Sequence, residues 1–191
     1  MDPINILIGI NIIASFGANV AGAKKGLKSS VIAVKERPVT YLQKLPLVLS
    51  TITLVALILA VFQVGTLEYK EEYFSLRITG LIIYIIFSWI QISAYKSLGE
   101  NYSQEILIFK NHSLVQKGMF RIIRHPQYLS QILLDIGGAL ATLSFIVAPV
   151  ALLQIPFIVM RASMEEKLLE KYFKNEFTEY KKKSGFMIPF L

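Results

Sequence analysis

The sequence predicts an all-α integral membrane protein, and three observations support that fold class. Of its 191 residues 54% are hydrophobic and only 17% are charged, with a mean hydropathy of +0.54, which is too apolar for a water-soluble domain of this length. Several apolar stretches are long enough to cross about 30 Å of hydrocarbon. The net charge of +7 suits anionic lipid headgroups and does not by itself indicate nucleic acid.

Three apolar stretches, residues 4–22, 45–65 and 78–95, each have the length of one membrane-spanning helix. A fourth stretch, residues 128–160, would be about 50 Å long as a single helix, which exceeds the bilayer thickness. We therefore expect a short helical hairpin there, with its turn near Ser144 and Pro149.

The loop charges predict the topology. Lys and Arg number six in residues 23–44, two in 66–77, five in 96–127 and seven from residue 161 onward. Because these residues accumulate on the cytoplasmic side, the three rich segments share a side only if the fourth stretch crosses an even number of times. We predict five transmembrane helices, with the N-terminus outside and the C-terminus cytoplasmic. The first helix lacks a basic leader and is not expected to be a cleaved signal.

The chain is expected to be a single domain over residues 1–191, because no repeat, low-complexity tract or flexible linker divides it. Residues 1–95 would form a three-helix scaffold, and residues 96–191 would form a polar loop, the hairpin and a C-terminal helix. The absence of cysteine excludes disulfides, thiolate metal sites and a cysteine nucleophile. With no eukaryotic targeting signal, a prokaryotic cytoplasmic membrane is the expected location.

Two groups of polar residues fall inside the expected spans. Asn11, Ser15 and Asn19 follow one another at a spacing of four residues, with Gly22 in line, which predicts a packing seam or a contact between two copies of the chain. Asp135 lies about two turns into a membrane helix, where an acid requires a partner. It could bind a polar group of a substrate or pair with an asparagine of the first helix.

Two polar segments, residues 99–128 and 161–180, flank the hairpin. Since the hairpin returns the chain to the face it left, both segments should meet at one membrane surface. The first segment holds His112 and His125, and its end could be a basic loop or the open, anion-binding start of a helix. The second predicts an amphipathic interfacial helix in which Arg161 and Glu165 share a turn, as an ordinary ion pair or as part of a site.

An ordered set of motifs runs through this half of the chain: residues 112–115, 118–120 and 124–128, then Arg161 with the acidic pair 165–166, and finally Tyr180 and residues 188–189. In these motifs the sequence resembles the isoprenylcysteine carboxyl methyltransferase family, membrane enzymes that use S-adenosylmethionine and are related to phospholipid methyltransferases. Phe120 stands where that family usually has tyrosine. Asp135 and Gln131 stand where its eukaryotic members are often apolar or aromatic, so the lipid substrate could differ.

The resemblance implies which residues form the site. Arg161 would orient the substrate carboxylate, with Arg124 as second choice. The residues implied for the cofactor are Glu105, His112, Ser113, Leu114, Val115, Gly118, Phe120, His125, Pro126, Gln127, Tyr128 and Glu165.

The implied reaction moves a methyl group from S-adenosylmethionine to the carboxylate of an isoprenylcysteine-like or other lipidic substrate, releasing S-adenosylhomocysteine at the membrane surface. A carboxylate is already ionised at pH 7 and needs no general base. Two alternatives stay open: methylation of a lipid amine, which requires a base such as His125 or Asp135, and a non-catalytic membrane protein. The expected partners are lipids, a prenylated substrate and a second copy of the chain, without metal or nucleic acid.

Overall fold

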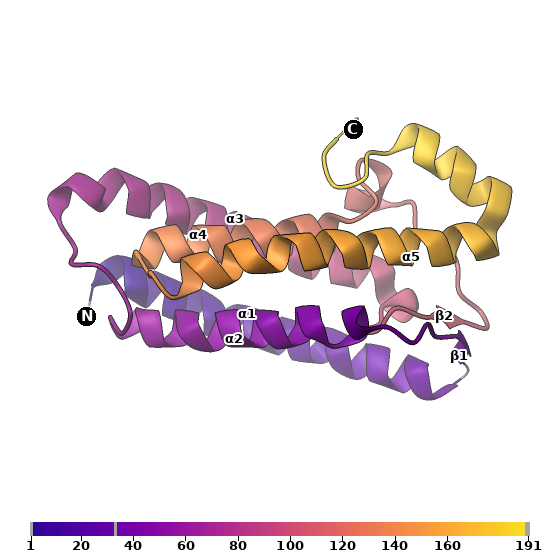
Figure 1. Cartoon of the computed structure of the whole chain (residues 1–191), viewed down its shortest axis with the longest axis horizontal. Helices are drawn as coiled ribbons and strands as arrows, with labels where there is room; N and C mark the ends of the chain where they lie inside the picture. Colours follow the sequence, from indigo (N-terminus) through magenta and orange to yellow (C-terminus); the bar gives the residue numbers. More distant parts are fainter. Residues whose placement is uncertain (1, 33, 190–191) are drawn as a thin grey trace.

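The computed structural model describes residues 2–32 and 34–189, and it describes the side chains of the first helix as far as residue 17. Five α-helices run along the long axis of the molecule (Figure 1). They are α1 (Pro3–Ile32), α2 (Leu45–Val61), α3 (Phe74–Leu98), α4 (Pro126–Thr142) and α5 (Val147–Lys183). The short strands β1 (Val34–Glu36) and β2 (Ile108–Phe109) pair antiparallel. Four single turns of 3-10 helix complete the order: η1 (Tyr41–Gln43), η2 (Glu71–Tyr73), η3 (Gly99–Asn101) and η4 (Gly118–Arg121).

Local sequence signals set the helix boundaries. Asp2 caps α1, because its Oδ1 accepts hydrogen bonds from the backbone N–H groups of Ile4 at 3.0 Å and Asn5 at 3.2 Å. Pro126 occupies the first turn of α4, where its missing N–H costs no helical hydrogen bond. The predicted hairpin is present, and its turn follows Leu143 in the left-handed conformation (φ 52°). Ser144 then accepts from the N–H of Val147 at 3.1 Å and caps α5.

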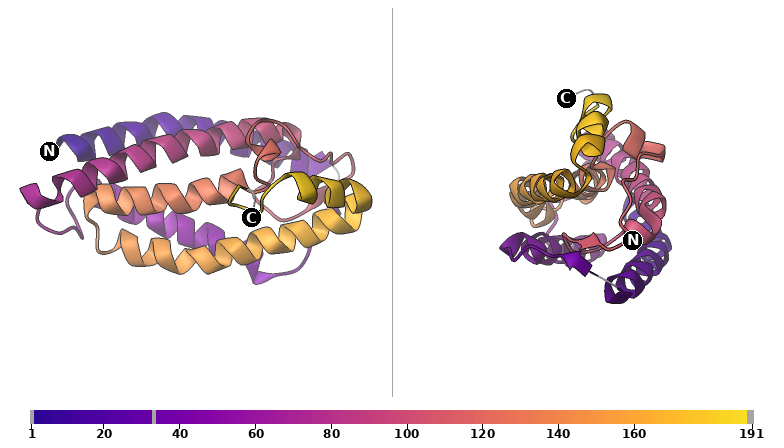
Figure 2. Two further views of the ribbon diagram at one scale, coloured as in Figure 1. Left: turned by 90° about the horizontal axis from the view of Figure 1, so that it is seen from above. Right: turned by 90° about the vertical axis from the view of Figure 1, so that its right-hand side faces the viewer.

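Pro149 is not part of that turn, since it lies in the first turn of α5, where proline is tolerated. The C-terminal helix also differs from the prediction. It does not begin at Arg161 as a separate element, because α5 continues from the hairpin to Lys183. Residues 157–173 contain neither glycine nor proline, so nothing in that sequence ends the helix. The break comes at Lys174 (φ 44°, ψ −118°), and the helical tail then folds back over the end of the bundle (Figure 2).

Three helical segments in the described part of the chain are long and apolar enough to cross a membrane: Tyr41–Val61, Glu71–Asn101 and Val147–Lys183. A shorter apolar helical stretch covers Pro3–Gly17. The 17 residues of α4 measure about 25 Å, slightly less than the hydrocarbon thickness. The fold is therefore a helical bundle with at least these candidate spans, and the count of five spans stays a prediction.

Glycines allow α3 and α4 to pack backbone to backbone. A Cβ atom on Gly80 would lie 2.5 Å from the backbone nitrogen of Ala141, and one on Gly137 would lie 2.7 Å from the backbone nitrogen of Tyr84. Such small residues allow the close helix contacts typical of membrane bundles. This pairing fixes the spacing of the two helices that extend toward the polar end of the molecule.

The polar seam of α1 packs against α3. Asn11 donates to Ser88 Oγ at 2.9 Å and accepts from Trp89 Nε1 at 3.1 Å, and Ser15 is 8% exposed. Asn19 and Gly22 lie outside the described side chains. The described members of the seam are thus buried within one chain, which gives no support to the expected contact between two copies.

A second polar cluster closes the end of the bundle where the chain starts. The buried guanidinium of Arg77 donates to both carboxylate oxygens of Asp2, at 3.0 and 2.5 Å, and to the carbonyl of Ala141 at 2.9 Å. The Tyr69 ring lies 3.7 Å from the Arg77 guanidinium carbon. The cluster therefore ties α1, α3 and α4 together.

The opposite end of the bundle collects the remaining long connections. The segments after α1, between α3 and α4, and after the bend of α5 all lie there (Figures 1 and 2). The tail contacts the loop before α4 directly: the N–H groups of Arg124 and His125 donate to the carbonyls of Gly185 and Phe186 at 2.9 and 3.1 Å. The two polar segments that flank the hairpin therefore meet, as expected.

Candidate active site

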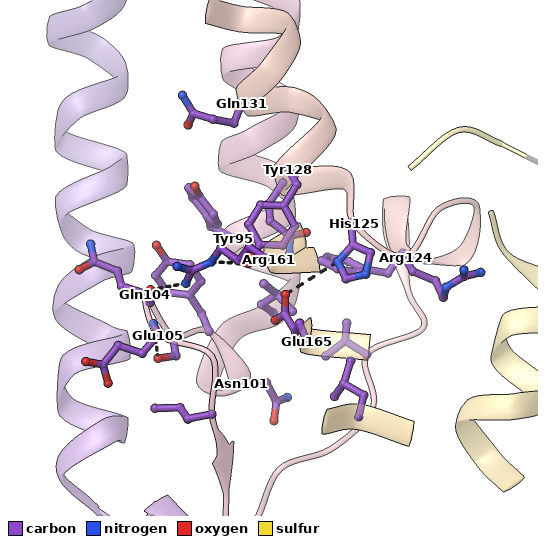
Figure 3. A pocket seen from close by; sticks show the side chains of 18 of the residues that line it. Tyr95, Asn101, Gln104, Glu105, Arg124, His125, Tyr128, Gln131, Arg161 and Glu165 are labelled. Carbon is purple, nitrogen blue, oxygen red and sulfur yellow. Dashed lines mark hydrogen bonds and ion pairs between the residues drawn. The ribbon is translucent and has the colours of Figure 1, made fainter. Parts of the chain in front are cut away.

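A cavity of about 300 Å³ lies at the end of the bundle where the two polar segments meet (Figure 3). Its wall combines residues of the loop between α3 and α4 with residues of α2, α3, α4 and α5. The expected site residues that line it are Glu105, His112, Ser113, Leu114, Val115, Phe120, Arg124, His125, Gln127, Tyr128, Arg161 and Glu165.

Two expected site residues are absent from that lining. Gly118 adopts a positive φ of 60° at the start of η4, a conformation that glycine adopts without steric cost. Pro126 fixes the first turn of α4. Both residues shape the backbone beside the cavity, and the expectation that they contact a cofactor stays a prediction.

Arg161 is buried, with 6% of its surface exposed, and it holds the cavity wall together. Its Nε donates to Tyr128 Oη at 2.8 Å. Its Nη1 donates to the carbonyls of Leu42 at 2.8 Å and Gln43 at 3.2 Å, and its Nη2 donates to the carbonyl of Gln104 at 2.5 Å. A single side chain thereby joins η1, the loop after α3, α4 and α5.

This geometry changes the role expected for Arg161. A guanidinium has five N–H donors, and these four contacts leave one N–H, on Nη2, without a partner among the described residues. The side chain cannot present a two-pronged fork to a carboxylate while they persist. It also forms no ion pair with Glu165 in the described part of the chain, where Glu165 instead faces His125.

Arg124, the second choice for a substrate arginine, is engaged elsewhere. Its Nε lies 2.5 Å from Glu166 Oε1, and its Nη1 donates to the carbonyl of Ser184. In Figure 3 the guanidinium points away from the centre of the cavity. We therefore assign it to fastening the tail onto the loop before α4, and no pattern in the sequence predicted Glu166 as its partner.

His125 lies between two acids at the start of α4. It is 2% exposed, its Nε2 is 3.3 Å from Glu166 Oε1 and its Nδ1 is 3.8 Å from Glu165 Oε2. The rings of Tyr128 and Phe186 pack on it at centroid distances of 5.6 and 5.1 Å. Among the described residues no side chain caps this helix start, so its first N–H groups lie open beside the acids, and anion binding there stays a prediction.

The loop wall of the cavity is held by paired hydrogen bonds. Asn101 Nδ2 donates to Ser113 Oγ at 3.0 Å, and the Ser113 N–H donates back to Asn101 Oδ1 at 2.9 Å. His112 lies between the rings of Phe109 and Phe173, at 5.8 and 5.9 Å. Burial lowers the pKa of His112, so its ring is neutral at pH 7.

Several buried polar atoms around this cavity have no hydrogen-bond partner among the described residues. They are His112 Nδ1, His125 Nδ1, Gln127 Oε1 and Glu165 Oε2. A buried polar atom without a partner costs about 1 to 3 kcal/mol, and such atoms are rare in folded proteins. Their concentration in one cavity makes it a place where water or a polar ligand can pair with them. Glu105 differs, because its carboxylate pairs with Arg37 at the surface.

Sequence reasoning missed part of the lining. Tyr95 and Tyr102, whose ring centroids are 4.7 Å apart, both line the cavity, whereas residue 95 was expected only as the last residue of the span 78–95. Gln91 and Ser50 also line it, deeper among the helices. A single tyrosine at a helix end does not distinguish an interfacial ring from a cavity wall, so no sequence signal would have identified them.

Comparisons with known proteins support the resemblance noted from the motifs. Residues 78–171 match the model of the isoprenylcysteine carboxyl methyltransferase (ICMT) family. Protein-S-isoprenylcysteine O-methyltransferase of Saccharomyces cerevisiae is 31% identical over 121 residues, which cover 60% of this chain and 49% of the yeast protein. A probable protein-S-isoprenylcysteine O-methyltransferase of Oryza sativa subsp. indica is 28% identical over 129 residues, covering 63% and 65%.

A solved structure of the eukaryotic intramembrane Ras methyltransferase ICMT is similar in fold. The TM-score is 0.57 at 20% sequence identity, and the match covers 75% of this chain and 51% of that one. This chain thus spans about half the length of the yeast relative and of the solved structure. The matched region includes α3, α4 and most of α5, which together carry much of the cavity wall.

Proposed function

We propose that this chain, whose residues 78–171 match the model of the isoprenylcysteine carboxyl methyltransferase family, belongs to that family and transfers a methyl group from S-adenosylmethionine to the carboxylate of a lipidic acid. The cavity is the observation that carries the proposal. One part of its wall is the polar loop between α3 and α4, and another part is made by helices apolar enough to cross a membrane. A water-soluble methyl donor and a lipid acceptor can meet only at such a boundary.

The donors and acceptors of the cavity fit S-adenosylmethionine. Among the residues that the structure describes, Glu165 Oε2 and Gln127 Oε1 are buried acceptors without a donor, and the cofactor carries an ammonium group and ribose hydroxyls that donate. A carboxylate-to-ammonium hydrogen bond is among the stronger polar contacts in proteins. The residues that would hold it are His112, Ser113, Leu114, Val115, Phe120, His125, Gln127, Tyr128 and Glu165. When bound, the cofactor supplies a methyl group activated by a sulfonium.

The acceptor carboxylate is already a nucleophile, with a reference pKa of about 4. The protein therefore needs to align and partly dehydrate it rather than remove a proton, and alignment alone can contribute up to roughly 7 to 11 kcal/mol in favourable cases. Arg161 supplies a buried positive charge and its remaining N–H on Nη2. Four contacts to the protein hold that group in place, so it is preorganised and makes one hydrogen bond to the acceptor.

The membrane arrangement belongs to the same proposal. All five helices would cross or enter the bilayer, with the cavity end toward the cytosol, where Lys and Arg are concentrated, and with the start of α1 on the other side. The acceptor would be an isoprenylcysteine-like acid or another lipid acid that enters from the hydrocarbon phase.

Transfer of labelled methyl from S-adenosylmethionine to lipid acids tests the proposal. The product should be an ester, which alkali cleaves. Glu165→Gln should weaken cofactor binding, since the amide removes the charge that faces the ammonium, whereas Glu176→Gln on the exposed tail should not. Arg161→Lys keeps the charge but cannot reproduce the four contacts, so turnover should fall by at least about tenfold with cofactor still bound.

Each alternative has its own signature in this experiment. An alkali-stable product would indicate methylation of a lipid amine. Absence of S-adenosylmethionine binding by calorimetry, in several detergents and lipids, would indicate a non-catalytic membrane protein. Wild-type binding and turnover in both Glu165→Gln and Arg161→Lys would refute the site proposed here.

A further inference from the structure

Five polar side chains from four helices form a connected chain inside the apolar bundle. Gln91 Nε2 of α3 donates to Gln131 Oε1 at 2.8 Å, and Gln131 Nε2 donates to Asp135 Oδ2 at 2.6 Å, both on α4. From α5, Gln154 Nε2 donates to the same oxygen. Ser50 of α2 donates to Gln154 Oε1 at 3.3 Å. Asp135 thus has amide partners. Of the two expected alternatives, pairing with Asn11 of the first helix is not found, because Asn11 contacts Ser88 and Trp89, and Asn19 lies outside the described side chains.

With its carboxylate ionised, Asp135 sets the direction of every bond in this chain. Its Oδ2 accepts from both Gln131 and Gln154, so each of these amides must turn its NH₂ group toward the acid and its oxygen away. The oxygen of Gln131 then accepts from Gln91, and the oxygen of Gln154 accepts from Ser50. Amide orientations follow from the hydrogen-bond network, and here an acceptor at the centre fixes all of them.

Both ends of the chain consequently present acceptors. Gln91 donates one of its two amide hydrogens to Gln131 and leaves the second hydrogen and Oε1, and Oε1 has no donor among the described residues. Ser50 has used its hydroxyl hydrogen and leaves its oxygen lone pairs. Both residues, together with Gln131, line the cavity of the candidate site, whereas Asp135 and Gln154 are buried behind them.

These acceptors lie deeper in the membrane part of the cavity than the polar groups assigned to the reaction. Gln131 follows Tyr128 by three residues on α4, which is about 5 Å along the helix axis. Tyr128 in turn contacts Arg161. Figure 3 shows Gln131 one turn beyond the level of Tyr128 and Arg161, on the side away from Glu165.

We propose that Gln91 and Ser50, oriented by Asp135 through Gln131 and Gln154, select lipid acids that carry a hydrogen-bond donor, such as a hydroxyl or amide N–H, about 5 to 10 Å from the reacting carboxylate. A plain hydrocarbon chain would cover these acceptors without satisfying them, whereas a chain with a donor would pair with them. This inference rests on the proposed methyl transfer and adds its substrate class.

Two synthetic acceptors test the inference. Both are S-alkyl cysteine acids of equal chain length, one with a plain alkyl chain and one with a single hydroxyl about 5 to 10 Å from the carboxylate. The wild-type protein should prefer the hydroxylated acid by about tenfold in kcat/KM. Gln91→Met removes the acceptor at similar volume and should bring that ratio toward one. Thr51→Val is the control, since Thr51 is exposed on α2 beside Ser50.

The outcomes separate the inference from the proposed function. A wild-type ratio of one, or a ratio unchanged in Gln91→Met, overturns the inference while methyl transfer stands. If neither acid is methylated, the proposed function fails, and thermal stabilisation by the two acids decides the inference. A larger rise in Tm with the hydroxylated acid than with the plain acid, lost in Gln91→Met, supports the inference. An equal rise in Tm with both acids overturns the inference. Should Gln91→Met not fold, Ser50→Ala at the other end of the chain takes its place with the same expected loss of preference.

Discussion

Replacing Gly80 by alanine tests how tightly α3 and α4 are held together. The added Cβ would lie 2.5 Å from the backbone nitrogen of Ala141 and 2.8 Å from the carbonyl oxygen of Gly137, almost 1 Å short of ordinary contact. Neither backbone atom can rotate away, so the two helices must separate. Overpacking of this kind costs about 1 to 3 kcal/mol, and the better helix propensity of alanine returns at most about 1 kcal/mol.

We therefore expect a net loss of about 1 to 2 kcal/mol in the free energy of unfolding for Gly80→Ala. For a chain of this length that corresponds to a Tm lower by about 2 to 8 °C, measured by thermal unfolding in detergent. Methyl transfer should also fall, because α3 carries Tyr95 and α4 carries Tyr128 into the cavity wall. Gly17→Ala on α1 is the matched control, since its Cβ would meet nothing within 4 Å. An unchanged Tm for Gly80→Ala would show that the close packing is not a constraint.

Three further predictions concern charge and topology. The Arg77 guanidinium holds the pKa of Asp2 below its usual range. The Tm of the wild-type protein should therefore exceed that of Asp2→Asn above about pH 4, and the difference should shrink as the pH falls further. A Tm difference that does not depend on pH would contradict this ion pair. Burial lowers the pKa of His112. The free energy of unfolding should therefore decline below about pH 6.5, because the unfolded chain takes up a proton there and the folded chain does not. The variant His112→Gln should show a smaller decline. Because the chain has no cysteine, the variants Glu68→Cys and Lys110→Cys each carry one thiol. A membrane-impermeant maleimide should label Glu68→Cys in intact cells, and it should label Lys110→Cys only after permeabilisation. The reverse pattern would contradict the proposed orientation.

The helical hairpin and the meeting of the two polar segments could be predicted because they follow from lengths and charges along the chain. An apolar stretch too long for one span must turn, and a turn returns the chain to the side it left. Most of the residues implied for the site by the motifs of the C-terminal half accordingly line one cavity. These features depend on order and composition alone.

The partners of individual polar groups could not be predicted in this way. Arg161 contacts carbonyls of Leu42 and Gln104, which are 119 and 57 residues away, and no periodicity reports which backbone groups face a side chain. Asp135 accepts from Gln154 rather than from α1 because α4 and α5 are neighbours in space at that level. The bend at Lys174 was missed for a related reason, since a non-glycine residue with positive φ is dictated by packing of the tail and not by its own sequence.

The four contacts of Arg161 also bear on how the protein is made. Its partners belong to segments that leave the ribosome well before it does, and the tail that fastens the loop before α4 leaves later still. A nascent chain inserted as far as the hairpin would hold every scaffold helix and still lack a finished pocket. Under the proposed function, we expect such unfinished chains neither to capture cofactor nor to methylate lipids.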